Sequence, residues 1–351
     1  MKSRAWVVNH RSQKCLGPAL WLGLLLARPL PACELCAIYS ASNARGEASE
    51  GFLFTMAEQF TSYGNLQFEG EEYRPTNIPY PLAAAYLDNF ITHFVPGYNF
   101  SPRVGLSVNV PLIHNDFRRV QITLPPPFGQ GVVDERGSET GLGDVALIGR
   151  FAVLQKVEMG WSAIVNLLGG IKFPTGSTDR LQEEVAEARI HRNLFPQQAD
   201  HIAIGGIHQH DLTLGSGSYD GVFGAAANFR WDRWLLNFQG QYYLRTEAGS
   251  YKFGDLIVAS GGPGAYLLLG KSCTLSLFAN AFYESSAQDE LFGLPTPRTG
   301  MTAWYLGPQL YLTLGEHFSA NAGVDIPLRI YNHGLQTVPD SRVRAGFTWR
   351  F

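Results

Sequence analysis

Apolar and polar residues alternate one by one through much of the chain, and the alternation is clearest at the C-terminus. In residues 342–351 one face reads Val, Ala, Phe, Trp and Phe, and the other reads Arg, Arg, Gly, Thr and Arg. A period of two residues predicts a β-strand with one apolar and one polar face. The pattern recurs in residues 103–112, 233–245, 304–314 and 318–330. We therefore expect a sheet that presents one face to an apolar medium.

Twelve such segments can be placed along the chain, and the linkers between them are alternately long and tight. Long outer loops and short periplasmic turns are the rule for bacterial outer-membrane barrels. A soluble β-sandwich can share the alternation within strands but gives no reason for alternating loop lengths. The expected strands are residues 51–64, 87–100, 102–113, 140–156, 159–173, 208–231, 233–246, 252–269, 273–286, 301–314, 317–331 and 342–351.

We therefore predict an all-β fold, a single closed antiparallel transmembrane β-barrel of about 12 strands with long extracellular loops and short periplasmic turns. Backbone groups in lipid must all be hydrogen-bonded, so the sheet has to close. One face of each strand then meets the lipid bilayer, and the other lines a polar lumen. This barrel is wider than those that side chains fill and narrower than the open porins. We expect a narrow or plugged lumen, in the outer membrane of a Gram-negative cell.

The N-terminus has the features of a secretory signal peptide. Four basic residues precede the apolar run 16–27, which is too short to cross a bilayer comfortably. We expect residues 1–32 to be the signal peptide, residues 33–50 a periplasmic or plug segment, and residues 51–351 the barrel. The alternative is an N-terminal anchor that is retained.

Composition supports an exported barrel and excludes other classes. Charged residues make up only 16% of the chain, yet the mean hydropathy is -0.05, as expected when apolar and polar positions alternate. With 27 basic and 30 acidic residues there is no basic excess for nucleic acid. Without residues 1–32 the balance is 22 to 30, a formal charge of -8. An aromatic content of 13% argues against disorder.

The last strand ends on Phe351, with aromatic residues also at the third-last and fifth-last positions. Such an ending resembles the terminal strand by which bacterial outer-membrane barrels are recognised. We therefore expect the barrel-assembly machinery to be a partner, through the strand that ends at Phe351.

Basic residues predominate among the polar positions that we assign to the lumen. Two interpretations are open: the charges are paired and hold the wall together, or they form a constriction that attracts anions. The expected lumen or solute contacts are Arg103, Arg150, Lys172, Arg245, Gln309, Tyr311, Arg329, Arg342, Arg344 and Arg350.

Cys33 and Cys36 form a CxxC motif just after the expected cleavage point. Ala37 stands where a haem-attachment motif has His, and no second CxxC completes a zinc site. Three interpretations are open: a disulfide or structural pair in an oxidising compartment, a redox or docking role, and acylation of Cys33. The porin component of porin–cytochrome conduits has a similar N-terminal CxxC, so a periplasmic redox partner is a second hypothesis.

His208 and His210 are two residues apart on an expected strand and would share a face. Imidazoles placed in this way can hold a divalent transition metal if a third ligand approaches. The alternative is a polar loop that lies on the barrel mouth without metal.

Ser216 and Ser218 lie near these histidines, but they stand in a Gly-Ser turn and not in a nucleophile-elbow motif. We therefore expect no catalysis and no cofactor.

Three glycine-rich segments follow one another in the middle of the chain: 141–145 (GLGDV), 169–176 (GGIKFPTG) and 214–220 (LGSGSYD). Together they resemble the outer-membrane family of phenol meta-pathway degradation proteins, also called transporter-like barrels. The resemblance implies a barrel that admits small, often hydrophobic or aromatic compounds, and it implies no enzyme. The leading hypothesis is a channel for a small organic solute; the alternative is a barrel that docks or sheathes a periplasmic redox or cytochrome partner.

Overall fold

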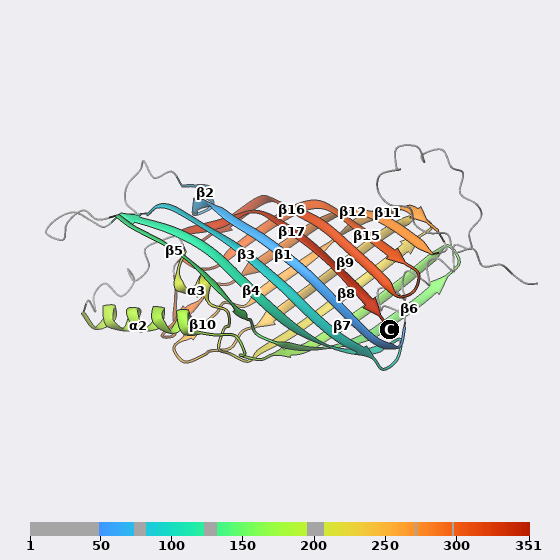
Figure 1. The fold of residues 1–351 in the computed structure, drawn as a ribbon, viewed down its shortest axis with the longest axis horizontal. Coiled ribbons are helices and arrows are strands. Elements are labelled where there is room, and N and C mark those ends of the chain that lie inside the picture. Colours follow the sequence, from blue (N-terminus) through green and yellow to red (C-terminus); the bar gives the residue numbers. More distant parts are fainter. Residues whose placement is uncertain (1–48, 74–81, 123–131, 195–206, 271, 297) are drawn as a thin grey trace, which may run out of the picture.

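The structure, a computed structural model, describes residues 49–73, 82–122, 132–194, 207–270, 272–296 and 298–351. Twelve strands in these ranges form one antiparallel sheet that closes into a barrel (Figure 1), which confirms the predicted fold. The barrel strands are β1 (Gly51–Phe68), β3 (Leu82–Asn99), β4 (Val104–Ile122), β6 (Ala146–Glu158), β7 (Trp161–Lys172), β8 (Asp220–Trp231), β9 (Trp234–Leu244), β11 (Leu256–Leu269), β12 (Cys273–Ser286), β15 (Met301–Leu314), β16 (Phe318–Asn332) and β17 (Leu335–Arg350).

The barrel closes where β17 pairs with β1. Met56 lies opposite Phe347, and the pairing continues from Leu53–Arg350 to Phe68–Leu335. The hydroxyl groups of Thr55 and Thr348 are 2.8 Å apart on this seam. Each barrel strand therefore has a neighbour on both sides, which removes the free edges that an open sheet would present.

The outward face of the barrel is an apolar belt. Large side chains that alternate with inward polar positions are about half exposed, among them Phe151, Leu167, Phe223, Phe238 and Leu306. Aromatic residues gather beside the tight turns and the C-terminus, as in the interfacial girdles of membrane barrels. They include Phe52, Phe100, Trp161, Trp231, Trp234, Trp349 and Phe351.

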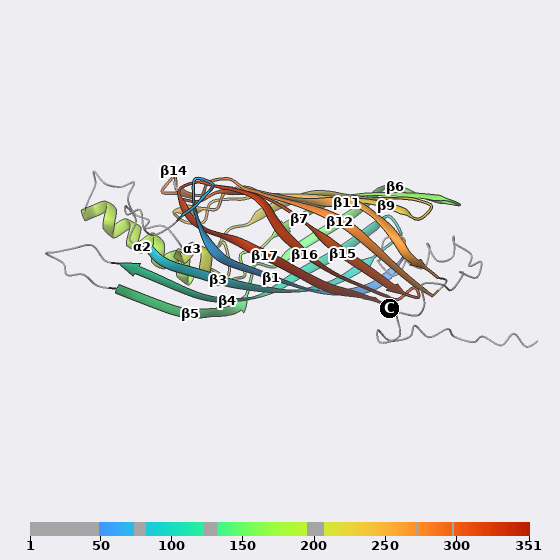
Figure 2. The ribbon, with the colours of Figure 1, turned by 90° about the horizontal axis from the view of Figure 1, so that it is seen from above.

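The other elements stand at the opposite end from the C-terminus, where the long connections lie (Figures 1 and 2). In a barrel with short periplasmic turns this is the extracellular end. In the described ranges no helix is long and apolar enough to cross a membrane. The elements are β2 (Glu71–Glu72), β5 (Val132–Leu142), α2 (Asp179–Leu194), α3 (Gln209–Leu212), β10 (Tyr251–Lys252), β13 (Glu290–Leu291) and β14 (Leu294–Pro295).

The expected strand 140–156 is in fact two elements, β5 and β6. Both pair with β4: Leu142 lies opposite Leu112, and Ala146 opposite Asn109. The break falls at residues 143–145, where the carboxylate of Asp144 accepts bonds from other loops and the strand cannot continue. At the extracellular end β4 thus lies between β5 and β3, which pairs with it as far as Leu82–Gln121 (Figure 2).

The expected strand 208–231 begins only at Asp220. Residues 209–212 form the short helix α3, and Gly217 has a φ of 73°, which interrupts a strand. The preceding loop contains α2, which the sequence pattern did not predict, because its apolar residues form no continuous stripe. Its Glu, Ala and Arg residues nevertheless favour a helix.

Candidate functional site in the barrel lumen

The short helix α3 packs against the inner face of the wall at the extracellular end (Figure 1). Leu212 at its end is fully buried, as is Ile207 just before it. These two side chains join a hydrophobic cluster with Leu87, Phe117 and Leu335, which come from three neighbouring regions of the wall. We call residues 207–212 the plug.

The plug is held by α2. The backbone N–H of His210 donates to Glu184 at 2.7 Å, and its ring Nδ1 is 2.9 Å from both carboxylate oxygens of the same residue. The ring of His208 stacks on that of His210, with centroids 5.3 Å apart and an interplanar angle of 9°. The carboxylate of Asp211 accepts the backbone N–H of His208 at 2.8 Å.

The two stacked histidines carry different charges. Burial opposes a charge on His210, but Asp211 and Glu184 outweigh it and raise the pKa of His210 to about 10. Burial and then the adjacent His210 lower the pKa of His208 to about 3. Desolvation also acts on Glu184, but the cation of His210 lowers the pKa of that carboxyl. At neutral pH this contact is therefore a buried pair of Glu184⁻ and His210⁺. We call the contact between these two side chains the latch.

This placement corrects the expected metal pair. His208 and His210 do not alternate along a strand, because His208 caps α3 and His210 lies within it. The ring Nδ1 of His210 contacts Glu184, and its Nε2 is 3.5 Å from Asp211. Across the described residues no group of three His, Cys, Asp or Glu side chains is placed to hold a metal ion.

Below the plug, the three glycine-rich segments meet around Lys172. Its ammonium group is 2.7 Å from Asp144, 2.6 Å from Asp220 and 2.6 Å from the hydroxyl of Ser216. Arg245 adds a contact of 3.3 Å to Asp220. Lys172 and Arg245 are thus ion-paired and tie loops to strands, as the first interpretation of the lumen charges predicts. The hydroxyl of Ser216 also donates to Asp144 at 2.8 Å, so it belongs to the same cluster.

Two basic residues of β17, Arg342 and Arg344, are paired in the same way. Arg342 is buried and lies 2.7 Å from Glu284, whereas Arg344 lies 2.8 Å from Asp325. Both guanidinium groups lie over the ring of Phe282, at 4.7 Å and 5.2 Å from its centroid. The result is a narrow layer in which acidic, basic and aromatic side chains of β12, β16 and β17 meet.

Two further arginines lie near the periplasmic end. The side chain of Arg150 donates to Asn99 at 3.0 Å and to Asn166 at 3.1 Å. Arg350, in the last strand, is half-buried, and its backbone carbonyl is bonded to the ring of His317 at 3.0 Å.

Two expected lumen residues are placed elsewhere. Trp304 lies opposite Arg329, but Tyr305 lies opposite Pro327, so Leu328 is an extra residue that forms a bulge. A bulge reverses the alternation of faces. Arg329 is consequently exposed on the outer face, 4.4 Å from the ring centre of Tyr331. Arg103 lies in the tight turn between β3 and β4, where it is exposed.

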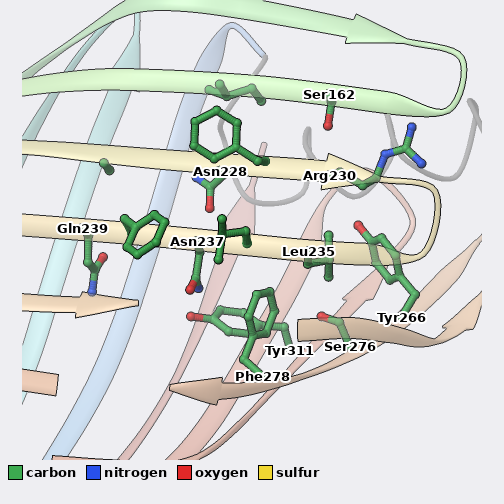
Figure 3. Close-up of a pocket in the computed structure, with 15 residues that line it drawn as sticks. Ser162, Asn228, Arg230, Leu235, Asn237, Gln239, Tyr266, Ser276, Phe278 and Tyr311 are labelled. Atoms are coloured by element: carbon green, nitrogen blue, oxygen red, sulfur yellow. The ribbon is translucent and has the colours of Figure 1, made fainter. Parts of the chain in front are cut away.

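The lower lumen contains a cavity of about 190 Å³, shown in Figure 3. Tyr311 lines it, and its strand neighbour Gln309 is buried on the same inward face. The sequence reasoning missed several lining residues, although strand parity could have found them. They are Ser162, Asn228, Arg230, Tyr266, Ser276 and Phe278.

Cys33 and Cys36 lie outside the described residues, as do the expected signal peptide and most of the segment 33–50. The structure therefore gives no placement for the CxxC motif. Cys273 lies in β12 and is partly buried.

A solved structure of an outer-membrane channel shares this architecture. The COG4313 outer membrane channel from Pseudomonas putida F1 is similar over 86% of this chain and 96% of that chain, with a TM-score of 0.58 and 11% identity. The β domain of the Bordetella autotransporter Brka has a TM-score of 0.39 at 12% identity, covering 86% of this chain and 100% of that chain. A Pseudomonas aeruginosa FadL homologue has a TM-score of 0.37 at 9% identity, covering 89% and 94%.

No family model and no curated protein matches the sequence. The resemblance to the phenol meta-pathway family therefore stays a prediction, and the likeness to the COG4313 channel establishes the fold. A closed antiparallel sheet with an apolar outer belt and a polar lumen is stable only in a membrane, and barrels of this kind are found in outer membranes. The chain is an outer-membrane β-barrel.

Proposed function

We propose that the chain is an outer-membrane channel for a small organic solute, closed at its extracellular mouth by the plug. The observation that carries the proposal is the position of Leu212, buried in the lumen on a four-residue helix that belongs to a loop. A segment of the wall has no alternative position, whereas a loop can leave the lumen if its anchor to Glu184 breaks. No catalytic step is included.

The lining of the lumen supports a solute that is small and partly apolar. The ion-paired layer of Arg342 and Arg344 leaves little net charge to favour a simple ion, and Phe282 and Tyr305 contribute aromatic faces beside it. The family resemblance points in the same direction, to hydrophobic or aromatic compounds. Transport would be diffusion down a gradient.

Planar-bilayer conductance of the purified protein tests the proposal. The wild type should show brief, discrete openings, and replacement of residues 207–212 by a Gly-Ser linker should raise the open probability at least tenfold. Lys252→Ala is the control, because its exposed pair with Glu290 stands at the same end but outside the plug. An ion-tight barrel after removal of the plug would contradict the channel.

The scaffold hypothesis depends on Cys33 and Cys36 and is tested separately. If the barrel docks a periplasmic redox partner there, the double variant Cys33→Ser/Cys36→Ser should lose co-purification of a cytochrome. An unchanged set of co-purifying proteins would exclude docking through this motif.

A further inference from the structure

The cavity in the lower lumen has the size of one aromatic ring with a small substituent. Its volume is about 190 Å³. An apolar cavity of about 150 Å³ in another protein takes up benzene, so the additional space accommodates a group of a few atoms. The cavity is bordered by residues of β7, β8, β9, β11, β12 and β15, most of them on the inward face, and belongs to the wall, not to a loop.

One side of the cavity is aromatic. The rings of Phe278 and Tyr311 are 5.3 Å apart and nearly perpendicular, at 73°. Tyr266 also lines the cavity and is buried. Figure 3 shows Phe278 and Tyr311 together, with Tyr266 drawn apart from them, toward Arg230. Ring faces and edges in this arrangement favour a further ring over an aliphatic chain.

The opposite side carries hydrogen-bonding groups and one charge. Asn228, Asn237 and Gln239 extend into the lumen from β8 and β9 (Figure 3). Among the described residues that line the cavity, Arg230 is the one with a full charge, and it is 5% exposed. Its guanidinium group donates to the backbone carbonyls of Asp232 at 2.8 Å and Glu158 at 3.4 Å, which fixes the cation at the periplasmic end.

We propose that this cavity is a binding site for a small aromatic monoanion, with the ring against Phe278 and Tyr311 and the anionic group toward Arg230. The proposal depends on the proposed channel in one respect, because the solute has to reach the site through the lumen. Because no carboxylate lines the cavity in the described chain, an aromatic cation of equal size has no partner there. The site thus lies where a solute would leave the barrel.

Isothermal titration of the purified full-length protein in detergent tests the site, with benzoate, benzyl alcohol and benzylamine as probes of one size. Benzoate should bind about tenfold more tightly than benzylamine, with benzyl alcohol between them. Arg230→Gln should abolish the difference between benzoate and benzyl alcohol, whereas Arg230→Lys should retain it. Folding of each variant is checked by its heat-dependent mobility on a gel.

Filling the cavity gives a second, independent measurement. Ser276 lines the cavity, so Ser276→Phe should abolish binding of both benzoate and benzyl alcohol. Ser285→Phe is the matched control, because Ser285 lies on the same strand outside the cavity and is hydrogen-bonded to Thr302. Benzoate affinity that survives Ser276→Phe overturns the site, and equal affinity for benzylamine overturns its preference for anions. Both readouts are equilibrium binding, so a failure of conductance contradicts the channel and leaves the site standing.

Discussion

The ring of His210 lies 2.9 Å from the carboxylate of Glu184, and this contact joins the plug in the barrel lumen to a helix outside it. Both side chains are buried. An isolated charge would be costly in this position, so each group depends on the other to remain ionised. Whether the plug closes the extracellular mouth therefore depends on the charges of His210 and Glu184.

The first prediction concerns pH. The pKa of His210 is raised from 6.5 to about 10, so its contribution to plug binding is complete below pH 6.5 and is lost as the pH rises through 10. The pKa of Glu184 is lowered from 4.5, so its contribution is present above pH 4.5 and is lost on further acidification. The open probability should be lowest between pH 4.5 and 6.5 and should rise steeply near pH 10 and in strong acid. A flat conductance profile from pH 3 to 11 would exclude the latch.

The second prediction removes one partner of this pair. Glu184→Gln leaves His210 buried beside an uncharged amide, and the loss of one member of a buried pair costs about 3–5 kcal/mol. That energy should appear as a large rise in open probability, measured in planar bilayers. Glu183→Gln on the same helix is the control, because Glu183 is exposed and its contact with Arg180 is 3.5 Å. Equal effects of the two variants would mean that the latch has no special role.

The third prediction concerns Lys172, which holds three loops together. Lys172→Ala leaves Asp144 without its cation and Asp220 with Arg245 alone, and should reduce the free energy of unfolding by about 3–5 kcal/mol. Lys252→Ala breaks a lysine–glutamate pair that is a third exposed and should cost about 1 kcal/mol or less. Urea unfolding in lipid vesicles distinguishes the two variants, and similar values would show that the buried cluster contributes little.

The fourth prediction concerns the ion-paired layer. Glu284→Gln removes the carboxylate that lies 2.7 Å from Arg342 and leaves the arginine in the lumen. The reversal potential in a salt gradient should then shift toward anion selectivity. Arg342→Gln should shift it in the opposite direction. If neither variant moves the reversal potential, ions do not pass this layer.

The fifth prediction concerns the last residue. The rings of Phe351 and Phe52 are 5.4 Å apart, and both are exposed, so either ring adds little to stability. If the assembly machinery reads the terminal aromatic residue, Phe351→Ala should lower the amount of folded barrel in the outer membrane severalfold. Phe52→Ala removes the same ring contact and should leave it unchanged. An equal loss from both variants would point to the ring contact itself.

The number and order of the strands could be predicted because lipid and lumen impose a strict alternation, as in the run from Trp304 to Leu314. The exceptions are places where local contacts override that alternation. Leu328 is an extra residue in its strand, and no property of a leucine reveals this, so Arg329 was assigned to the wrong face. Likewise His208 and His210 have the spacing of a strand, but the stacking of their rings and the contact with Glu184 depend on a helix far away in the sequence.

The candidate site was predictable only in part. Strand parity correctly turned Lys172, Arg342 and Arg344 inward, but their acidic partners come from other strands and loops, so the sequence could not tell paired from free charges. Parity alone would also have turned Arg230 and Tyr266 inward. Parity does not give the position of a residue along the barrel axis. That position decides whether Arg230 and Tyr266 line the same cavity.

The barrel can close only when the whole chain has been made, because its last strand, β17, pairs with its first, β1, along one seam. Thr55 and Thr348, which are 293 positions apart, meet on this seam, so the first strand has no permanent neighbour on one side until the last has been made. A chain that stops before β17 leaves two unpaired edges, on β1 and on β16, that lipid cannot satisfy. The two ends of the chain thus hold each other in the lipid, since each supplies the hydrogen-bonding partners that the other strand needs.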